Sequence, residues 1–389
     1  ALATFWMILG DHAEAARRLR LALEAPRRED RPVPDDAEAV ALGGYLFNTV
    51  MAGGDARDDP FIGVTGRDSE HPLAAMIEPA IALLTGDTAR GVAAIDRRLP
   101  ERDPWTRAAL HLMRAMLNGN QGEMDAAHQD LAVAEAAFRE AGERVGLSLA
   151  LVFLADTQTV RGEFDEAVAG LEESIALLRG LGQGDNTGMQ RVMLAVARAR
   201  SGDTRRARDE LTAMIVPGAG TQARYLVSVR LALGDLARHA GDVDEAHEHY
   251  DAAERETQRV PSYLQYRSLL EAARGQLAIG RDDPDAARRH LRTALDLAID
   301  GPDIPIAAVT GFAVARLRAS ADPARAAEVL GASSVLRGAP DAFNPDVALV
   351  TRDLRRALGE RTYRDAHARG ARLDVPAALA LVKDQLRRR

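Results

Sequence analysis

The residue types that most often carry chemistry occur in this chain without the spacing that chemistry requires. His247 and His249 are two residues apart, which places them about 200° apart around a helix, so they cannot easily face one metal ion. Glu245 and His249 share a helix face at a spacing that commonly stabilises helices. Cysteine is absent, which excludes thiol catalysis, disulfides and cysteine-ligated zinc. We therefore predict no catalytic residue and no metal site.

One glycine-rich segment, residues 180–185, is superficially similar to a phosphate-binding loop. A dinucleotide-binding loop follows a β-strand, and no strand pattern precedes this segment. The chain also has no Gly-x-x-x-x-Gly-Lys-Ser/Thr, His-Glu-x-x-His or Gly-x-Ser-x-Gly motif. We interpret the segment as a flexible connector between two helices, and we predict no bound cofactor.

The elements that would have to position any site are revealed by a recurring turn signal, in which a glycine and an acid are followed by an alanine. From Gly122 the signal recurs at steps of 40, 40, 39, 39 and 41 residues. Periods of this size are typical of helical solenoids, in which each repeat packs on its neighbours. The clearest copies lie at Gly122-Glu123, Gly162-Glu163, Gly202-Asp203 and Gly241-Asp242.

The copy at residues 148–180 shows what one repeat encodes. Apolar residues recur at the three- and four-residue spacing of a one-sided helix on both sides of Gly162. Glycine tolerates a positive φ at a helix end, and we expect Asp165 to cap the second helix. Ala155 and Ala167 are small where the two helices should cross, and Ser174 should let the next repeat approach. This size code resembles the tetratricopeptide repeat, and the resemblance implies an all-α right-handed superhelix of about 8–9 helical hairpins.

The expected domain organisation follows from where the repeat signal is regular. We predict a truncated first repeat at 1–25, a degenerate repeat with a long loop at 26–72, a tetratricopeptide-like array at 73–330 and capping helices at 331–389. A weak helical pair is expected around 37–51, followed by the loop at 55–71. Because the helical pattern is already running at Ala1, without a start methionine, we expect the chain to be a piece of a longer protein.

Charge and hydropathy limit the partners. The net charge is −8 and the pI is about 5.7, so bulk electrostatics do not favour nucleic acid. No apolar run approaches the roughly 20 residues that span a bilayer. We predict no direct nucleic-acid or membrane partner and a cytoplasmic location.

The register of the repeats predicts which side chains of the first helices face an inner groove. The amino-terminal part of this strip is apolar and the carboxyl-terminal part is charged, and Asp235 and Arg274 are expected to pair. The functional interpretation is a groove for a peptide or a small molecule; the alternative is ordinary helix packing and surface charge. The candidate groove residues are Leu112, Met116, Asp156, Thr159, Val192, Val196, Asp235, Arg238, Arg267 and Arg274.

Three stretches carry a family resemblance. They are the opening Phe5-Trp6-Met7-Ile8-Leu9-Gly10-Asp11, the pair Asp103-Pro104-Trp105-Thr106-Arg107 with Phe138-Arg139-Glu140-Ala141-Gly142-Glu143-Arg144-Val145-Gly146, and the closing Ala326-Ala327-Glu328-Val329-Leu330-Gly331 with Leu358-Gly359-Glu360-Arg361-Thr362-Tyr363. Together they resemble the C-terminal tetratricopeptide region of large SARP/AfsR-like actinobacterial regulators. In that family a winged-helix DNA-binding domain, a bacterial transcriptional activation domain and an NB-ARC-type ATPase precede this region.

The resemblance implies a non-enzymatic regulatory interaction module of a transcriptional activator of secondary metabolism. Its partners would be other domains of the same polypeptide or separate proteins, and it would modulate the linked ATPase and DNA-binding domains. This chain corresponds to the last part alone, so neither DNA binding nor ATP hydrolysis is assigned to its residues. The alternative is a receptor for a small molecule or short peptide in the concave groove, and an enzyme is a third hypothesis.

Overall fold

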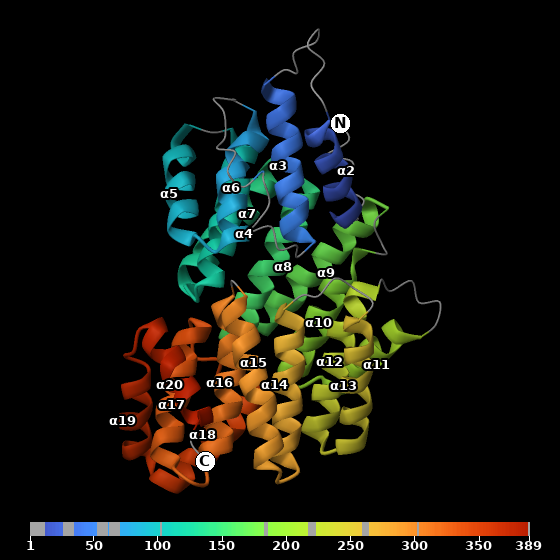
Figure 1. The fold of residues 1–389 in the computed structure, drawn as a ribbon. Coiled ribbons are helices and arrows are strands. Elements are labelled where there is room, and N and C mark those ends of the chain that lie inside the picture. Colours follow the sequence, from blue (N-terminus) through green and yellow to red (C-terminus); the bar gives the residue numbers. More distant parts are fainter. Residues whose placement is uncertain are drawn as a thin grey trace. The chain divides into compact units, whose positions relative to one another are not determined.

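The computed structural model describes residues 12–25, 35–52, 61, 71–101, 103–182, 186–216, 223–258, 264–301 and 303–387. Within these ranges the chain is built from α-helices and short 3-10 turns, and no residue lies in a β-strand (Figure 1). The predicted all-α fold class is confirmed. Residues 1–11, most of the expected loop at 55–71 and residues 183–185 lie outside the described part of the chain.

The helices follow one another as consecutive hairpins. The first set is α2 (His12–Glu24), α3 (Asp35–Met51), η2 (Pro72–Met76), α4 (Ile77–Thr85), α5 (Thr88–Arg98), η3 (Leu99–Glu101), α6 (Pro104–Asn120), α7 (Met124–Glu140), α8 (Arg144–Arg161) and α9 (Phe164–Gly180). The second set is α10 (Gly188–Arg200), α11 (Thr204–Ile215), α12 (Ala223–Ala240), α13 (Val243–Thr257), α14 (Leu264–Gly280), α15 (Pro284–Asp300), α16 (Ile304–Arg318), α17 (Pro323–Arg337), α18 (Pro345–Leu358), α19 (Glu360–Gly370) and α20 (Val375–Arg387).

The turn signal works as a helix stop followed by a helix start. Gly202 has a φ of 104°, in the region that favours glycine, and ends the hairpin's first helix. The carboxylate of Asp203 then accepts a hydrogen bond from the Arg206 amide at 3.3 Å and caps α11. The expected cap at Asp165 is wrong, because α9 already begins at Phe164 and Asp165 lies within its first turn.

The size code places small side chains where helices meet. Ala155 and Ala167 are both buried, and Leu171 is completely buried beside them. The Ser148 and Ser174 hydroxyls lie 2.7 Å apart and share a buried hydrogen bond between α8 and α9. The same complementarity appears in the next hairpins, where a Cβ on Gly234 would lie 2.4 Å from the Tyr250 ring. Small residues therefore set how closely the helices of a pair approach each other.

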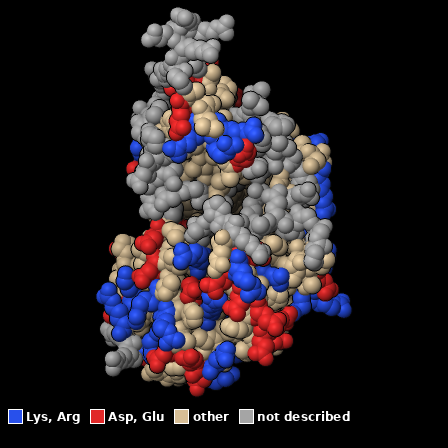
Figure 2. Space-filling view, turned by 45° about the vertical axis from the view of Figure 1, so that its right-hand side comes forward, with Lys and Arg blue, Asp and Glu red and all other residues tan. Residues whose placement is uncertain are grey.

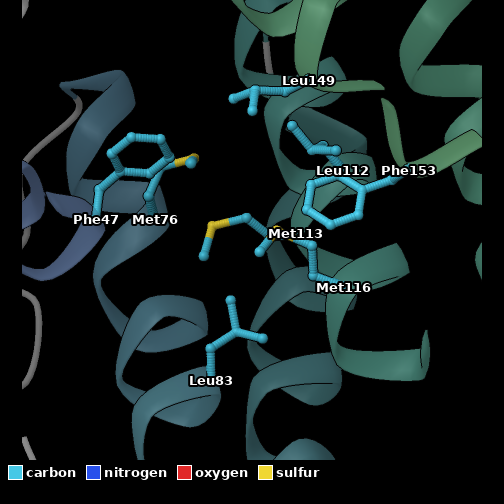
Figure 3. Close-up of a pocket in the computed structure, with 8 residues that line it drawn as sticks. All are labelled: Phe47, Met76, Leu83, Leu112, Met113, Met116, Leu149 and Phe153. Atoms are coloured by element: carbon cyan, nitrogen blue, oxygen red, sulfur yellow. The ribbon is translucent and has the colours of Figure 1, made fainter. Parts of the chain in front are cut away.

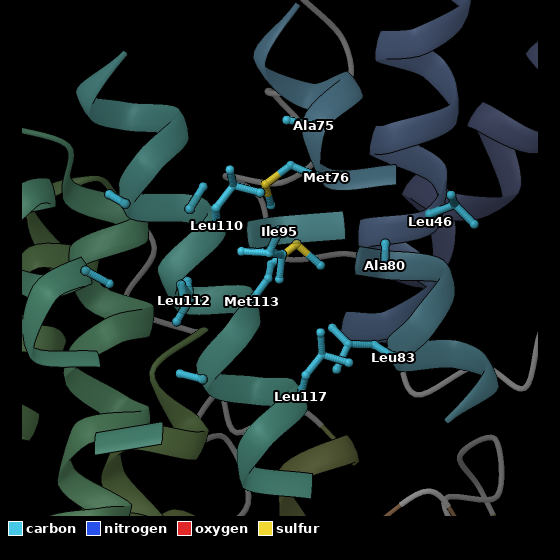
Figure 4. Close-up of a cluster of buried hydrophobic side chains, with 14 of the residues drawn as sticks. Leu46, Ala75, Met76, Ala80, Leu83, Ile95, Leu110, Leu112, Met113 and Leu117 are labelled. Carbon is cyan, nitrogen blue, oxygen red and sulfur yellow. The ribbon is translucent and has the colours of Figure 1, made fainter. Parts of the chain in front are cut away.

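The chain divides into two compact units. The first comprises residues 1–118, 125–154 and 173–187, and the second comprises 119–124, 155–172 and 188–389. The core of the first unit is drawn in Figure 4, where side chains of η2 and α4 pack on Leu110, Leu112, Met113 and Leu117 of α6. The domain boundaries expected from the sequence stay a prediction.

In the second unit, α12, α13, α14 and α15 lie side by side (Figure 1). The last three helices pack on α16 and α17, with α17 in extensive contact with α19. Gly331 and Gly370 allow this contact, because a Cβ on Gly370 would lie 1.8 Å from the Glu328 carbonyl oxygen. The backbones of α17 and α19 therefore touch directly.

Candidate functional site

An apolar pocket in the first unit contains the two candidate groove residues Leu112 and Met116. Side chains of α3, η2 and α4 face those of α6 and α8 across it (Figure 3). The enclosed volume is about 20 Å³, and the space that includes its open side is about 350 Å³. The lining residues are Phe47, Met76, Leu83, Leu112, Met113, Met116, Leu149 and Phe153, and no polar surface is exposed in the pocket.

Helical spacing explains why these side chains converge. Leu112 and Met116 are four residues apart on α6, and Leu149 and Phe153 have the same spacing on α8, so each pair lies on one helix face. Met116, Leu149 and Phe153 are only half-buried, which leaves apolar surface open at the mouth. The methionines lining the pocket have flexible side chains that repack easily around another apolar group.

A polar cluster fixes α6 in position. The Asp130 carboxylate accepts hydrogen bonds from His111 at 2.8 Å and from Arg114 at 2.7 and 2.9 Å, and Arg114 also reaches Asp96 on α5 at 2.6 Å. Burial by itself would raise the pKa of Asp130, but the hydrogen bonds from His111 and Arg114 hold it below its usual value. The cluster ties α6 to α5 and α7 and so holds the pocket-lining helix in place.

In the second unit, three apolar or neutral candidates take part in packing. Thr159 is buried, and its hydroxyl donates to the Ala155 carbonyl oxygen at 2.7 Å. Val192 is buried and Val196 is half-buried, whereas Arg267 is exposed. None of these four residues lines either of the two pockets described in this subsection.

Four of the charged candidates, Asp156, Asp235, Arg238 and Arg274, are engaged in ion pairs. Arg238 donates to both carboxylate oxygens of Asp346, at 2.7 and 2.8 Å, and to Asp235 at 3.0 Å. Arg274 instead donates to Asp251 at 2.8 Å and to Glu254 at 2.6 Å. The expected pair between Asp235 and Arg274 is therefore wrong.

The partners that replace that pair come partly from the repeats and partly from outside them. The Tyr250 hydroxyl, from the second helix of the same hairpin, donates to Asp235 at 2.8 Å. Asp346 follows α17 and lies more than a hundred residues from Arg238 in the sequence. Burial opposes its ionisation, yet hydrogen bonds from His239 and Arg238 hold the pKa of Asp346 far below its usual value.

A segment that sequence reasoning did not assign to the site covers this charged strip. Residues 338–344 connect α17 to α18, and together with the first two residues of α18 we call them the 338–346 segment. Asp341 is buried and accepts from Arg200 at 3.0 Å, while Arg337 at the end of α17 lies 3.5 Å from Asp156. The signal available in the sequence was a proline-containing stretch with two acids and Phe343, just after the regular period ends.

A second cleft lies between α17, α18 and α19. Its volume is about 630 Å³, and Arg352, Arg355 and Arg364 are among the residues that line it. Arg355 lies over the Tyr363 ring at 5.1 Å from the centroid and forms an exposed ion pair with Glu360. Burial and then the nearby Arg355 lower the pKa of His367 in this cleft, so its imidazole is neutral at pH 7.

The described residues offer few other sites. They contain no group of three or more His, Cys, Asp and Glu side chains placed to hold a metal ion. None of the helices in the described ranges combines the length and the apolar character needed to cross a membrane. Figure 2 shows acidic and basic side chains intermixed over the face that it displays, so the charge on that face is not of a single sign.

Comparison with known proteins defines the fold class. No protein-family model and no curated protein sequence matches this chain. The solved apo form of the quorum sensor NprR from B. thuringiensis is 14% identical over 81% of this chain and 87% of its own, with a TM-score of 0.50. A Rap protein complexed with Competence and Sporulation Factor is 10% identical over 90% of this chain and 99% of its own, with a TM-score of 0.60.

A third solved structure has a similar fold. Aspartyl phosphate phosphatase F from Bacillus subtilis is 10% identical over 93% of each chain, with a TM-score of 0.50. Identities this low establish a shared architecture and nothing about chemistry. The chain therefore has a tetratricopeptide-like helical fold of the kind found in these proteins.

Proposed function

We propose that this chain is a regulatory interaction module that recognises an apolar side chain of a peptide segment in the pocket of the first unit. The observation that carries the proposal is the convergence of half-buried Phe47, Met116, Leu149 and Phe153 on a pocket without polar lining. Exposed apolar surface of this kind costs free energy in water, and a partner's side chain would cover it.

The small enclosed volume indicates how the pocket would be used. About 20 Å³ is room for roughly one water molecule, so a free ligand of drug size does not fit without rearrangement. An apolar side chain presented by a peptide needs only the mouth, where Met116 and Phe153 can repack around it. A protein or peptide partner therefore fits better than a small metabolite, which stays the second candidate.

The likeness to the quorum sensor NprR and to a Rap protein complexed with Competence and Sporulation Factor supports a receptor role for this fold. The resemblance to SARP/AfsR-like regulators supports a more specific context. There the module would act in the cytoplasm, without catalytic activity of its own, and would bias linked ATPase and DNA-binding domains. The likeness to a protein named as a phosphatase is one of fold alone.

The test is a binding assay with a matched pair of variants. The chain would be screened by thermal shift against short peptides and against metabolites, because a ligand of the folded state raises the melting temperature. Met116→Asp places a charge at the mouth and should abolish the shift. Val133→Asp makes the same kind of change at an exposed position of α7, outside the pocket, and should leave the shift intact.

A regulatory role would be tested separately by adding the chain in trans to its parent regulator lacking this region. We expect the added chain to change the ATPase rate, the oligomeric state or promoter binding, and Met116→Asp to reverse that change. Absence of any effect in all three measurements would overturn the regulatory proposal. A thermal shift that survives in Met116→Asp would overturn the assignment of the pocket.

A further inference from the structure

The 338–346 segment crosses the ends of several successive hairpins of the second unit. It starts at Gly338, which ends α17 with a φ of 82°. A Cβ on Gly338 would lie 1.7 Å from the Gly122 carbonyl oxygen, so the segment begins with direct backbone contact to the turn that precedes α7. Along the segment, Asp341 contacts the last turn of α10, Phe343 contacts the turn at Gly162, and Asp346 contacts the last turn of α12.

Two carboxylates and one aromatic ring hold the segment. Asp341 is 3% exposed and accepts from Arg200 at 3.0 Å, and Asp346 accepts from Arg238 at 2.7 and 2.8 Å. Between them, Phe343 lies edge-on to the Phe164 ring at 5.4 Å, with an angle of 84° between the ring planes. Pairs of this geometry attract one another beyond their buried area.

The surface beneath the segment is shaped for it. Gly162 lies directly under the Phe343 ring, and a Cβ there would come within 2.3 Å of that ring. Arg200 and Arg238 are 38 residues apart and occupy the last turns of successive first helices, α10 and α12. The repeat itself therefore presents two guanidinium groups at equivalent places of successive hairpins, and the aromatic site at Gly162 and Phe164 belongs to the hairpin before them. We call Gly162, Phe164, Arg200 and Arg238 the acceptor track.

The contact between the 338–346 segment and the acceptor track is made mainly by side chains. The backbone hydrogen bonds of the segment are local, from the Asn344 amide to the Asp341 carbonyl and from the amide of Ala348 in α18 to the Asn344 carbonyl. The Phe343 side chain remains 48% exposed although it is the central anchor. Recognition by two charge pairs and one ring depends on a short chemical pattern, and another segment with the same pattern could satisfy it.

We propose that the acceptor track is a recognition site for an extended segment in which two carboxylates flank an aromatic ring, and that the 338–346 segment fills it in cis. A partner protein carrying the pattern Asp-x-Phe-x-x-Asp replaces the chain's own segment on the acceptor track. This replacement breaks the contact of Asp346, at the start of α18, with Arg238. The linked segment competes at an effective concentration of about 1 mM, so exchange requires a partner of high affinity or high local concentration. This site is separate from the pocket of the first unit and does not rest on the proposed function.

The test uses a fluorescein-labelled synthetic peptide of residues 338–347 and a released variant, Phe343→Ala with Asp346→Asn. The released variant should bind the peptide in trans at least about tenfold more tightly than the wild-type chain, because its own segment no longer competes. Adding Arg238→Gln to the released variant should abolish binding. A peptide with both aspartates replaced by asparagine should not bind. Adding Val133→Asp, an exposed change outside both sites, to the released variant should leave binding unchanged.

Two results would overturn the inference. One is a released variant that melts cooperatively but does not bind the peptide at millimolar concentration; the other is equal binding with and without Arg238→Gln. If the released variant does not fold, the wild-type chain is studied by hydrogen exchange with millimolar unlabelled peptide. Faster exchange in residues 341–348 would support displacement, and unchanged exchange there would refute it.

Discussion

The direct backbone contact between α17 and α19 makes a strong prediction about Gly331. A Cβ at this position would lie 2.0 Å from the His367 carbonyl oxygen and 2.9 Å from the Ala371 amide nitrogen. Ordinary contacts begin near 3.4 Å, and neither group belongs to a flexible side chain, so Gly331→Ala must force the two helices apart by more than 1 Å. Overpacking and the loss of buried contacts should together destabilise the second unit by about 3–5 kcal/mol.

Gly280→Ala is the matched control. Gly280 is the exposed last residue of α14, and the nearest atom to an added Cβ is the Arg316 guanidinium nitrogen at 3.9 Å. The same substitution should therefore stabilise the chain by about 0.5–1 kcal/mol, through helix propensity and a less flexible unfolded state. The two variants differ in the sign of the effect although the added atom is identical.

The assay is thermal and urea unfolding followed by circular dichroism. For a unit of this size, 1 kcal/mol corresponds to about 2–4 °C in melting temperature, so Gly331→Ala should lower the melting temperature of the second unit by roughly 6–20 °C. The reasoning would be refuted if Gly331→Ala unfolded within about 1 kcal/mol of the wild type. A comparable loss of stability in Gly280→Ala would refute the control and with it the steric explanation.

Two further predictions concern the charged networks of the second unit. Burial raises the pKa of Asp303 to about 6; the charge of Arg337 opposes this rise and that of Asp156 adds to it. Between pH 4 and 6 the folded state therefore binds more protons than the unfolded state. The free energy of unfolding consequently falls as pH increases through this range. Asp303→Asn should therefore flatten this part of the stability profile and stabilise the chain above pH 6 by at most about 3 kcal/mol, measured as the difference between variant and wild-type unfolding at each pH. Tyr250→Phe removes the hydroxyl that donates to Asp235 at 2.8 Å and should cost about 1–3 kcal/mol in urea unfolding, with unchanged helix content. A variant as stable as the wild type would show that this partly buried hydrogen bond makes no net contribution.

The sequence predicted only part of the lining of the apolar pocket. The register of the first helices identified Leu112 and Met116, because both belong to a long, strongly periodic helix. Phe47 and Met76 complete the lining, yet Phe47 lies in a stretch that the prolines and paired glycines marked as degenerate, where α3 nevertheless extends over Asp35–Met51. Local composition suggested weak helix there, and packing against α2 and α4 overrides it.

The sequence by itself determined the repeating unit, since the glycine stop, the acidic cap and the small residues act between neighbours a few residues or one hairpin apart. Those local rules yield the helical hairpins of the array and their close packing. Only the tertiary structure decided how the charged strip is used, because Asp341 and Asp346, which pair with Arg200 and Arg238, come from the 338–346 segment, more than a hundred residues away. A repeat period specifies nearest-neighbour contacts, and it carries no information about which distant segment returns to cover them.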